Sequence, residues 1–129
     1  MAPLIYLLED DSSLRELMCE VLREELDARL EACATMAQLL AHCTTSTPDL
    51  IVADFWGASH LTLNDVERSE ICALAAIAPL VLVSARNWAL DMNATELGLA
   101  ALLPKPLDLE GFVSALQTAL TTAPMLGCS

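Results

Sequence analysis

Positive charge is scarce in this sequence. Lys and Arg number 6 against 18 Asp and Glu in 129 residues, so the formal net charge at pH 7 is -12. A surface with this excess of carboxylates repels nucleic-acid phosphates and anionic lipid headgroups. We therefore expect the domain to make no direct contact with nucleic acid or with a membrane.

Paired cysteine motifs and long apolar runs are also missing. The sequence has five cysteines, an odd number, so at least one would stay unpaired in any disulfide framework. No two of them form a Cys-x-x-Cys motif of the kind that binds metals. Buried, reduced thiols are therefore favoured over disulfides or a metal site. No basic segment precedes the acidic residues 9–11, which argues against a signal peptide. The most apolar stretch, 71–83, is interrupted by Pro79 and is shorter than the ~20 residues that span a bilayer. These features predict a cytoplasmic protein.

Apolar residues, by contrast, are abundant at 55% of the chain. A chain of this length can bury one sizeable core but not two. We therefore assign residues 1–122 to one folded domain and residues 123–129 to a tail or linker stump.

Short apolar runs alternate with segments of helical periodicity. The runs predict strands at 4–8, 29–34, 50–54, 80–83 and 100–103. A capping box, Ser13-x-x-Glu16, predicts the start of the first helix. The later helices are expected from Thr35 to about Cys43, from Thr62 or Asn64 to about Ala76, over 87–97, and from Asp108 to about Thr121. Strands alternating with helices predict an α/β fold, a doubly wound three-layer sandwich around a parallel sheet.

Polar residues with distinct chemistry follow four of the predicted strands. Glu9 and Asp10 follow the first strand, Asp54 ends the third, Ser84 ends the fourth and Lys105 follows the fifth. In an open α/β sheet these ends meet at the edge where ligands bind. Asp11 is instead expected to serve the N-terminus of the first helix.

This set of residues suits phosphoryl transfer. Crowded carboxylates repel one another, and a hard cation such as Mg²⁺, which prefers oxygen ligands, removes that cost. Asp54 would act as the nucleophile that forms an acyl phosphate. Lys105 and the metal would neutralise the transferring oxygens, and Ser84 would donate a hydrogen bond to one of them.

The same residues carry a resemblance to a known family. Ile5-Tyr6-Leu7-Leu8-Glu9-Asp10-Asp11, Leu50 to Asp54, Leu82-Val83-Ser84-Ala85-Arg86 and Leu103-Pro104-Lys105-Pro106 resemble the four signature segments of response regulator receiver domains. The resemblance covers nearly the whole chain. It implies a flavodoxin-like (βα)5 fold with a five-stranded parallel sheet in the order 2-1-3-4-5.

The resemblance also implies a set of roles. Asp54 would accept a phosphoryl group from a histidine kinase or phosphotransfer protein, with Mg²⁺ held by Glu9, Asp10, Asp54 and the backbone carbonyl of Trp56. Lys105 would contact the phosphoryl group and Ser84 would report its arrival. The face of the fourth helix, fifth strand and fifth helix would pass the signal to a partner or output domain, and a weak homodimer is a further option. Such a domain is no enzyme beyond its own phosphorylation and dephosphorylation.

Two departures from the family pattern keep alternatives open. The loop Phe55-Trp56-Gly57-Ala58-Ser59-His60 lacks the usual turn, and Leu102 stands where the family has an aromatic switch residue. No output domain follows, so the chain is expected to be a stand-alone or an excised receiver. The alternatives are a receiver-like module that binds partners without phosphorylation, and a metal-dependent phosphatase. The phosphatase would need a second acid where Trp56 stands.

Overall fold

A parallel sheet lies at the centre of the structure, a computed structural model that describes residues 3–54, 65–84, 101–104 and 109–127. Its strands are β1 (Leu4–Leu8), β2 (Arg29–Cys33), β3 (Leu50–Asp54), β4 (Leu80–Ser84) and β5 (Ala101–Pro104). Neighbouring strands pair in parallel in the order β2-β1-β3-β4-β5. This order agrees with the one expected from the sequence.

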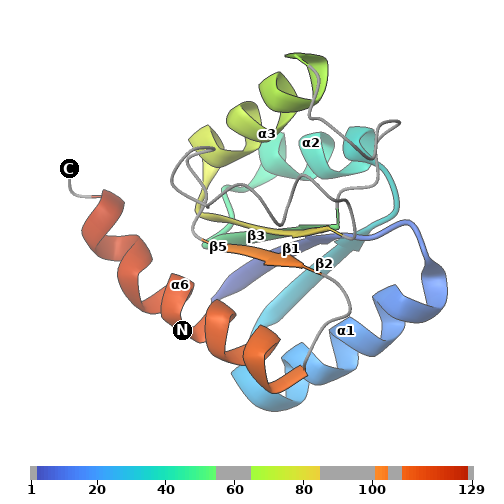
Figure 1. Cartoon of the computed structure of the whole chain (residues 1–129), viewed down its shortest axis with the longest axis vertical. Coiled ribbons are helices and arrows are strands. Elements are labelled where there is room, and N and C mark those ends of the chain that lie inside the picture. Colours follow the sequence, from blue (N-terminus) through green and yellow to red (C-terminus); the bar gives the residue numbers. More distant parts are fainter. Residues whose placement is uncertain (1–2, 55–64, 85–100, 105–108, 128–129) are drawn as a thin grey trace.

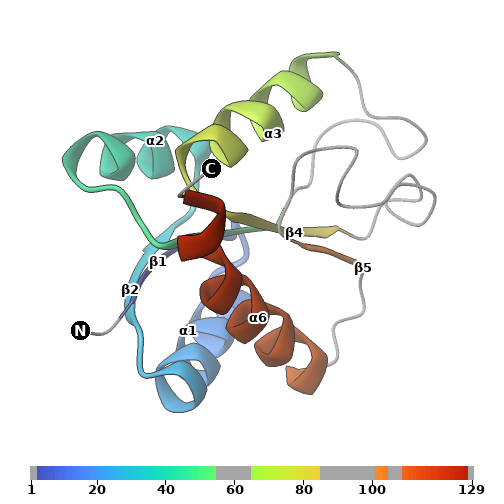
Figure 2. The ribbon, with the colours of Figure 1, turned by 90° about the vertical axis from the view of Figure 1, so that its left-hand side faces the viewer.

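Helices cover both faces of the sheet. They are α1 (Ser12–Leu26), α2 (Met36–Thr45), α3 (Asp65–Ile77) and α6 (Leu109–Gly127). Figure 1 shows α2 and α3 above the sheet and α1 and α6 below it, and Figure 2 shows the same three layers from the side. The predicted flavodoxin-like α/β fold with a parallel sheet is confirmed. The helix predicted over 87–97 lies outside the described residues.

The central strand β3 is buried on both faces. Leu50, Ile51 and Val52 have no exposed surface. Because side chains alternate along a strand, Leu50 and Val52 pack with α1 and α6, while Ile51 and Ala53 pack in the cluster beneath α2 and α3. The unbroken apolar run at 50–52 is therefore the signature of a strand covered on both sides, as predicted.

Helix α1 differs from its prediction in two respects. Asp11, not Ser13, is its N-cap: the Oδ1 atom of Asp11 accepts the backbone N–H of Leu14 at 3.0 Å. The predicted capping box at Ser13 is wrong, because a helix has one N-cap and the carboxylate is already in place. The helical spacing of Leu17 with the other apolar residues of the first helix predicts a buried side chain, yet Leu17 is 45% exposed and Cys19 is buried on that face instead. Helix α1 ends at Asp27, which adopts a left-handed backbone conformation with φ of 48°.

Helix α2 begins where the sequence predicts. The hydroxyl of Thr35 accepts the N–H of Gln38 at 3.2 Å, and the side chain of Gln38 in turn accepts the N–H of Ala34 at 2.8 Å. The hydroxyl of Tyr6 lies 2.8 Å from the carbonyl oxygen of Ser46, which ties β1 to the end of α2. This tie fixes α2 against the sheet.

The last helix is longer than predicted. Helix α6 continues past the expected end at Thr121 to Gly127. The extension contains Pro124, a residue that usually interrupts a helix, so local propensity did not predict it. In the part of the chain that the structure describes, no helix is both long and apolar enough to cross a bilayer.

Candidate functional site

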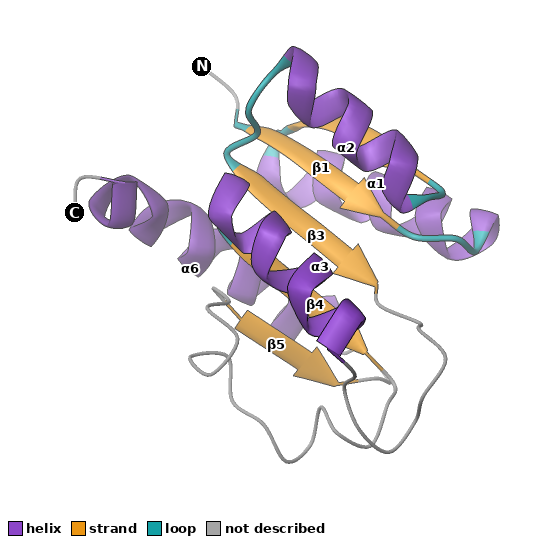
Figure 3. Cartoon of the chain, turned by 90° about the horizontal axis from the view of Figure 1, so that it is seen from above, coloured by secondary structure: helices purple, strands orange, loops and turns teal. Residues whose placement is uncertain are grey.

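The strands β1, β3, β4 and β5 all point the same way, so their carboxyl ends share one edge of the sheet (Figure 3). Leu8 of β1 pairs with Ala53 of β3. Glu9 and Asp54 are therefore the next residues on two neighbouring strands. The sheet register thus brings the first acidic segment and the proposed nucleophile side by side along the backbone.

The other two strand ends continue this line. Asp54 pairs with Val83, the residue before Ser84. Ser84 in turn pairs with Pro104, the residue before Lys105 in the sequence. The backbone therefore orders the predicted site residues across the edge in the sequence β1, β3, β4, β5.

Glu9 is a buried carboxylate at this edge, with 1% of its surface exposed. Its backbone N–H donates to the carbonyl of Cys33 on β2 at 3.0 Å, and its Oε1 atom accepts the N–H of Asp11 at 3.0 Å. Its own carbonyl oxygen accepts a hydrogen bond from Nη1 of Arg15 at 2.8 Å. These contacts hold Glu9 in place on both sides, and they offset part of the cost of burying a charged group.

Asp10 and Asp11 differ from Glu9 in the exposure of their side chains and in the hydrogen bonds that they make. Both are exposed. The Asp11 side chain is occupied as the cap of α1, as the sequence predicts for a helix N-terminus. Asp10 remains beside Glu9 as a second carboxylate that faces solvent. Carboxylate oxygens from Glu9 and Asp10, at the edge where Asp54 ends β3, are the hard donors that Mg²⁺ prefers.

Some predicted site residues lie beyond what the structure describes. Trp56 and Lys105 are outside the described residues, and for Asp54 and Ser84 the structure describes the backbone. Among the described side chains, no group of three or more His, Cys, Asp or Glu could hold a metal ion. The Asp54 carboxylate is not among those side chains, so the complete ligand set stays a prediction.

Cys33 lies next to Glu9 in the sheet but does not act as a thiolate. Burial, with smaller contributions from Glu31 and Cys43, raises the pKa of the Cys33 thiol from 9.0 to about 11. At neutral pH this thiol is protonated and is therefore a poor nucleophile. Glu9 and Asp10 remain the candidate oxygen ligands that the structure describes at this edge.

Arg15 contacts the acidic segment at this edge of the sheet, and the sequence pattern did not predict that contact. In the sequence, Arg15 falls with Glu16, Arg23 and Glu24 on the polar face of the first helix, which predicts a solvent-facing side chain. In the structure Arg15 is half-buried and donates to the Glu9 carbonyl. A usable signal was its position. Arg15 lies in the first turns of the helix that directly follows the acidic segment, so its long side chain can reach back to the end of β1.

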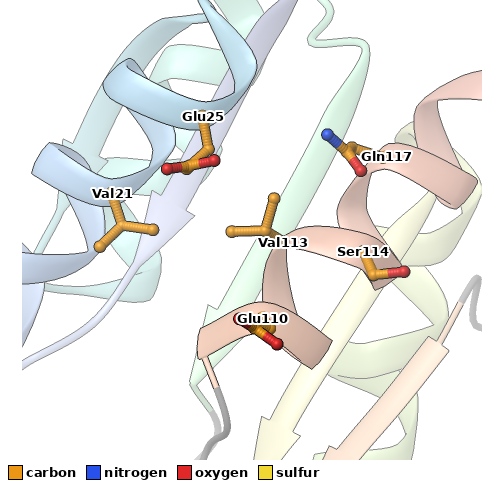
Figure 4. Close-up of a pocket in the computed structure, with 6 residues that line it drawn as sticks. All are labelled: Val21, Glu25, Glu110, Val113, Ser114 and Gln117. Atoms are coloured by element: carbon orange, nitrogen blue, oxygen red, sulfur yellow. The ribbon is translucent and has the colours of Figure 1, made fainter.

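A groove of about 390 Å³ lies elsewhere, between α1 and α6. Figure 4 shows Val21 and Val113 projecting into the space between the two helices, with Glu25 and Glu110 nearby. Ser114 and Gln117 complete its lining. None of these six residues is a cation, so the groove has no group that could neutralise a phosphoryl oxygen. Its lining gives no reason to move the candidate site away from the strand ends.

Comparison with known proteins gives a result from structure and none from sequence. No protein-family model matches the chain, and no curated protein sequence matches it. Among solved structures, the HemR receiver domain of Leptospira biflexa has 27% identity and a TM-score of 0.69, with 92% of this chain and 94% of that chain covered. The chemotaxis response regulator CheY4 of Vibrio cholerae has 17% identity and a TM-score of 0.71, with 92% and 99% covered.

A receiver domain protein of Clostridium thermocellum has 16% identity and a TM-score of 0.76, and the match covers 98% of this chain and 99% of that chain. The chain has the fold of a response regulator receiver domain. The fold that the resemblance in the sequence implied is thereby confirmed. The receiver fold places Glu9 and the ends of β3 and β4 at the edge where the sequence predicts the site.

Proposed function

We propose that this chain is a phospho-accepting receiver domain of a two-component or phosphorelay pathway. The observation that carries the proposal is the order of the strand ends. The register aligns the end of β1, with its buried Glu9 and exposed Asp10, beside Asp54 at the end of β3, and Ser84 follows on β4. Lys105 directly follows β5, which pairs with β4.

Asp54 takes the phosphoryl group in this proposal. A carboxylate oxygen of Asp54 attacks the phosphorus, the bond between phosphorus and the donor atom breaks, and the donor leaves with the electron pair. Lys105 offsets the negative charge on the phosphoryl oxygens, and the hydroxyl of Ser84 donates to one of them. The donor is a histidine kinase or a histidine-containing phosphotransfer protein.

Mg²⁺ fits the donor set of this edge. Glu9, Asp10, Asp54 and the backbone carbonyl of Trp56 would hold it. When bound, the ion supplies positive charge that offsets repulsion between the carboxylates and the phosphoryl group. Phosphorylation would then bias the face formed by residues 87–97, β5 and α6, which would control a partner protein or an output domain.

The proposal is tested by intact mass after incubation with MgCl2 and a small phosphodonor such as acetyl phosphate. We expect the mass to increase by one phosphoryl group. The increase should be absent when the incubation contains EDTA instead of MgCl2, and absent from Asp54→Asn. Asp49→Asn is the matched control, because Asp49 is exposed and directly precedes the same strand at its opposite end. That variant should be phosphorylated like the parent.

Other outcomes would point to the alternatives. Mg²⁺ binding without any phosphoryl adduct would contradict the proposal and favour a module that binds partners without phosphorylation. Steady turnover of phosphoesters with no lasting adduct would favour a phosphatase.

A further inference from the structure

Arg15 occupies a position that helix electrostatics disfavour. It lies in the first turns of α1, near the positive end of the helix dipole, where carboxylates are stabilised and cations are not. The helical residues of the first turn of α1 include no acid, and the carboxylate of the N-cap Asp11 accepts the N–H of Leu14. The hydrogen bond that the structure shows for the Arg15 guanidinium is made at the end of β1.

That interaction is the hydrogen bond from Nη1 of Arg15 to the carbonyl oxygen of Glu9, at 2.8 Å. This carbonyl and the N–H of Asp10 belong to one planar peptide unit. The guanidinium therefore fixes the orientation of the peptide that joins the two acidic residues. The N–H of Glu9, bonded to Cys33, and the Oε1 atom of Glu9, bonded to Asp11, fix the same segment from its other sides.

The reach of the Arg15 charge agrees with this placement. Burial raises the pKa of Cys33 and of Cys19, and the positive charge of Arg15 opposes both shifts. Cys33 ends β2 and Cys19 lies on the buried face of α1. The hydrogen bond to the Glu9 carbonyl places the guanidinium at the end of β1, beside the acidic segment.

We infer that Arg15 is a positioning residue for the metal site, holding the Glu9–Asp10 peptide in the orientation that presents both carboxylates to Mg²⁺. The inference rests on the proposed function and adds a residue to it. A group that orients a metal ligand through a hydrogen bond lowers the ordering that binding must impose. Removing such a group weakens metal binding even though the ligands themselves remain.

The positive charge of Arg15, taken alone, predicts that removing Arg15 strengthens Mg²⁺ binding. The positioning role predicts that it weakens Mg²⁺ binding, so the inference can be tested. A cation near the site repels Mg²⁺, so a purely electrostatic role would give tighter binding when Arg15 is neutralised. A positioning role gives weaker binding. Arg15→Lys separates the two, because it keeps the charge and loses the planar fork of donors.

The experiment is calorimetric titration of the full chain with MgCl2. We expect Arg15→Met to weaken Mg²⁺ binding by about 10- to 100-fold, with a smaller loss in Arg15→Lys. Arg23→Met is the matched control, since Arg23 is an exposed cation of the same helix. Its effect should stay below about twofold, because exposed charges are screened by solvent and salt.

Amide hydrogen exchange without Mg²⁺ gives a second readout. We expect faster exchange at Asp10 and Asp11 in Arg15→Met than in the parent and the Arg23 variant. The inference is overturned if Arg15→Met binds Mg²⁺ as tightly as the parent or tighter, or if the Arg23 variant loses as much. If Arg15→Met does not fold, Arg15→Lys decides, and parental affinity in that variant overturns the inference. A parent that binds no Mg²⁺ would instead contradict the proposed function.

Discussion

Cys33 illustrates how burial decides the chemistry of a single residue. Only 2% of Cys33 is exposed, and burial is the main cause of a thiol pKa near 11. Cys72, on α3, is exposed. A reagent in solution can therefore reach the thiol of Cys72 but not that of Cys33. The raised pKa of Cys33 also lowers the fraction of Cys33 that is present as thiolate.

We expect Cys72 to react with a maleimide at pH 8 at least about 100-fold faster than Cys33, since a rise of the Cys33 pKa from 9.0 to about 11 removes about 99% of its thiolate. Peptide mass mapping over time measures both rates. The Cys33 rate should keep rising with pH toward 11. Equal rates at the two residues would show that Cys33 is not buried as described.

The same pKa shift makes folding sensitive to alkaline pH. The folded-state pKa of Cys33 lies above its unfolded value of 9.0. Its contribution to the free energy of unfolding is therefore complete below pH 9 and is lost as the pH rises through about 11. Cys33→Ala should show a flatter decline over this window in denaturant titrations.

Single residues also mark the limit of prediction from the sequence. Glu9 and Asp10 could be predicted as an acidic pair because they directly follow an apolar run. The periodicity of α1 does not reveal the hydrogen bond of Arg15, because it places Arg15 on the same polar face as the exposed Arg23. The one signal was position: Arg15 follows the acidic segment closely and Arg23 does not.

At the scale of the element, the start of α1 gives a direct test of capping. Asp11→Ala should lower the free energy of unfolding by about 1 kcal/mol, because the N–H of Leu14 loses its partner. Ser13→Ala is the control from the same turn and should change it by less than about 0.5 kcal/mol. Urea unfolding in the absence of Mg²⁺ measures both. A Ser13 effect as large as that of Asp11 would restore the capping box at Ser13.

Element boundaries were predicted well where one signal dominates. Thr35 was predicted as a cap and is one, because Gln38 completes the pattern. At the start of α1, Asp11 and Ser13 both carry capping side chains, and local sequence does not rank them. The end of α6 was placed too early at Thr121, because two β-branched threonines and Pro124 are residues that usually end a helix.

At the scale of the whole molecule, a net charge of -12 opposes folding through self-repulsion. Raising NaCl should therefore raise the melting temperature, by roughly 3–6 °C for each 1 kcal/mol that screening relieves. At matched ionic strength MgCl2 should raise it further, because a bound ligand stabilises the folded state. Differential scanning calorimetry distinguishes the two effects. Equal shifts in the two salts would contradict a specific Mg²⁺ site.

The architecture was the most predictable level. Five short apolar runs separated by helical periodicity leave few alternatives to a parallel sheet covered on both faces. Leu50, Ile51 and Val52 carried most of that information, because an unbroken apolar strand must be covered on both sides. The Phe55–His60 loop and the roles of Trp56 and Lys105 stay predictions, since they lie outside the described residues.

The central claim is that Asp54 carries the phosphoryl group, and locating that group tests it most directly. After incubation with MgCl2 and acetyl phosphate, borohydride reduction converts an aspartyl phosphate into a stable homoserine, which peptide mass spectrometry can locate. We predict the reduced residue at position 54, at the end of β3, and none in samples kept in EDTA. Reduction at Asp10, Asp11 or Asp49, or at no residue in a protein that binds Mg²⁺, would contradict the account.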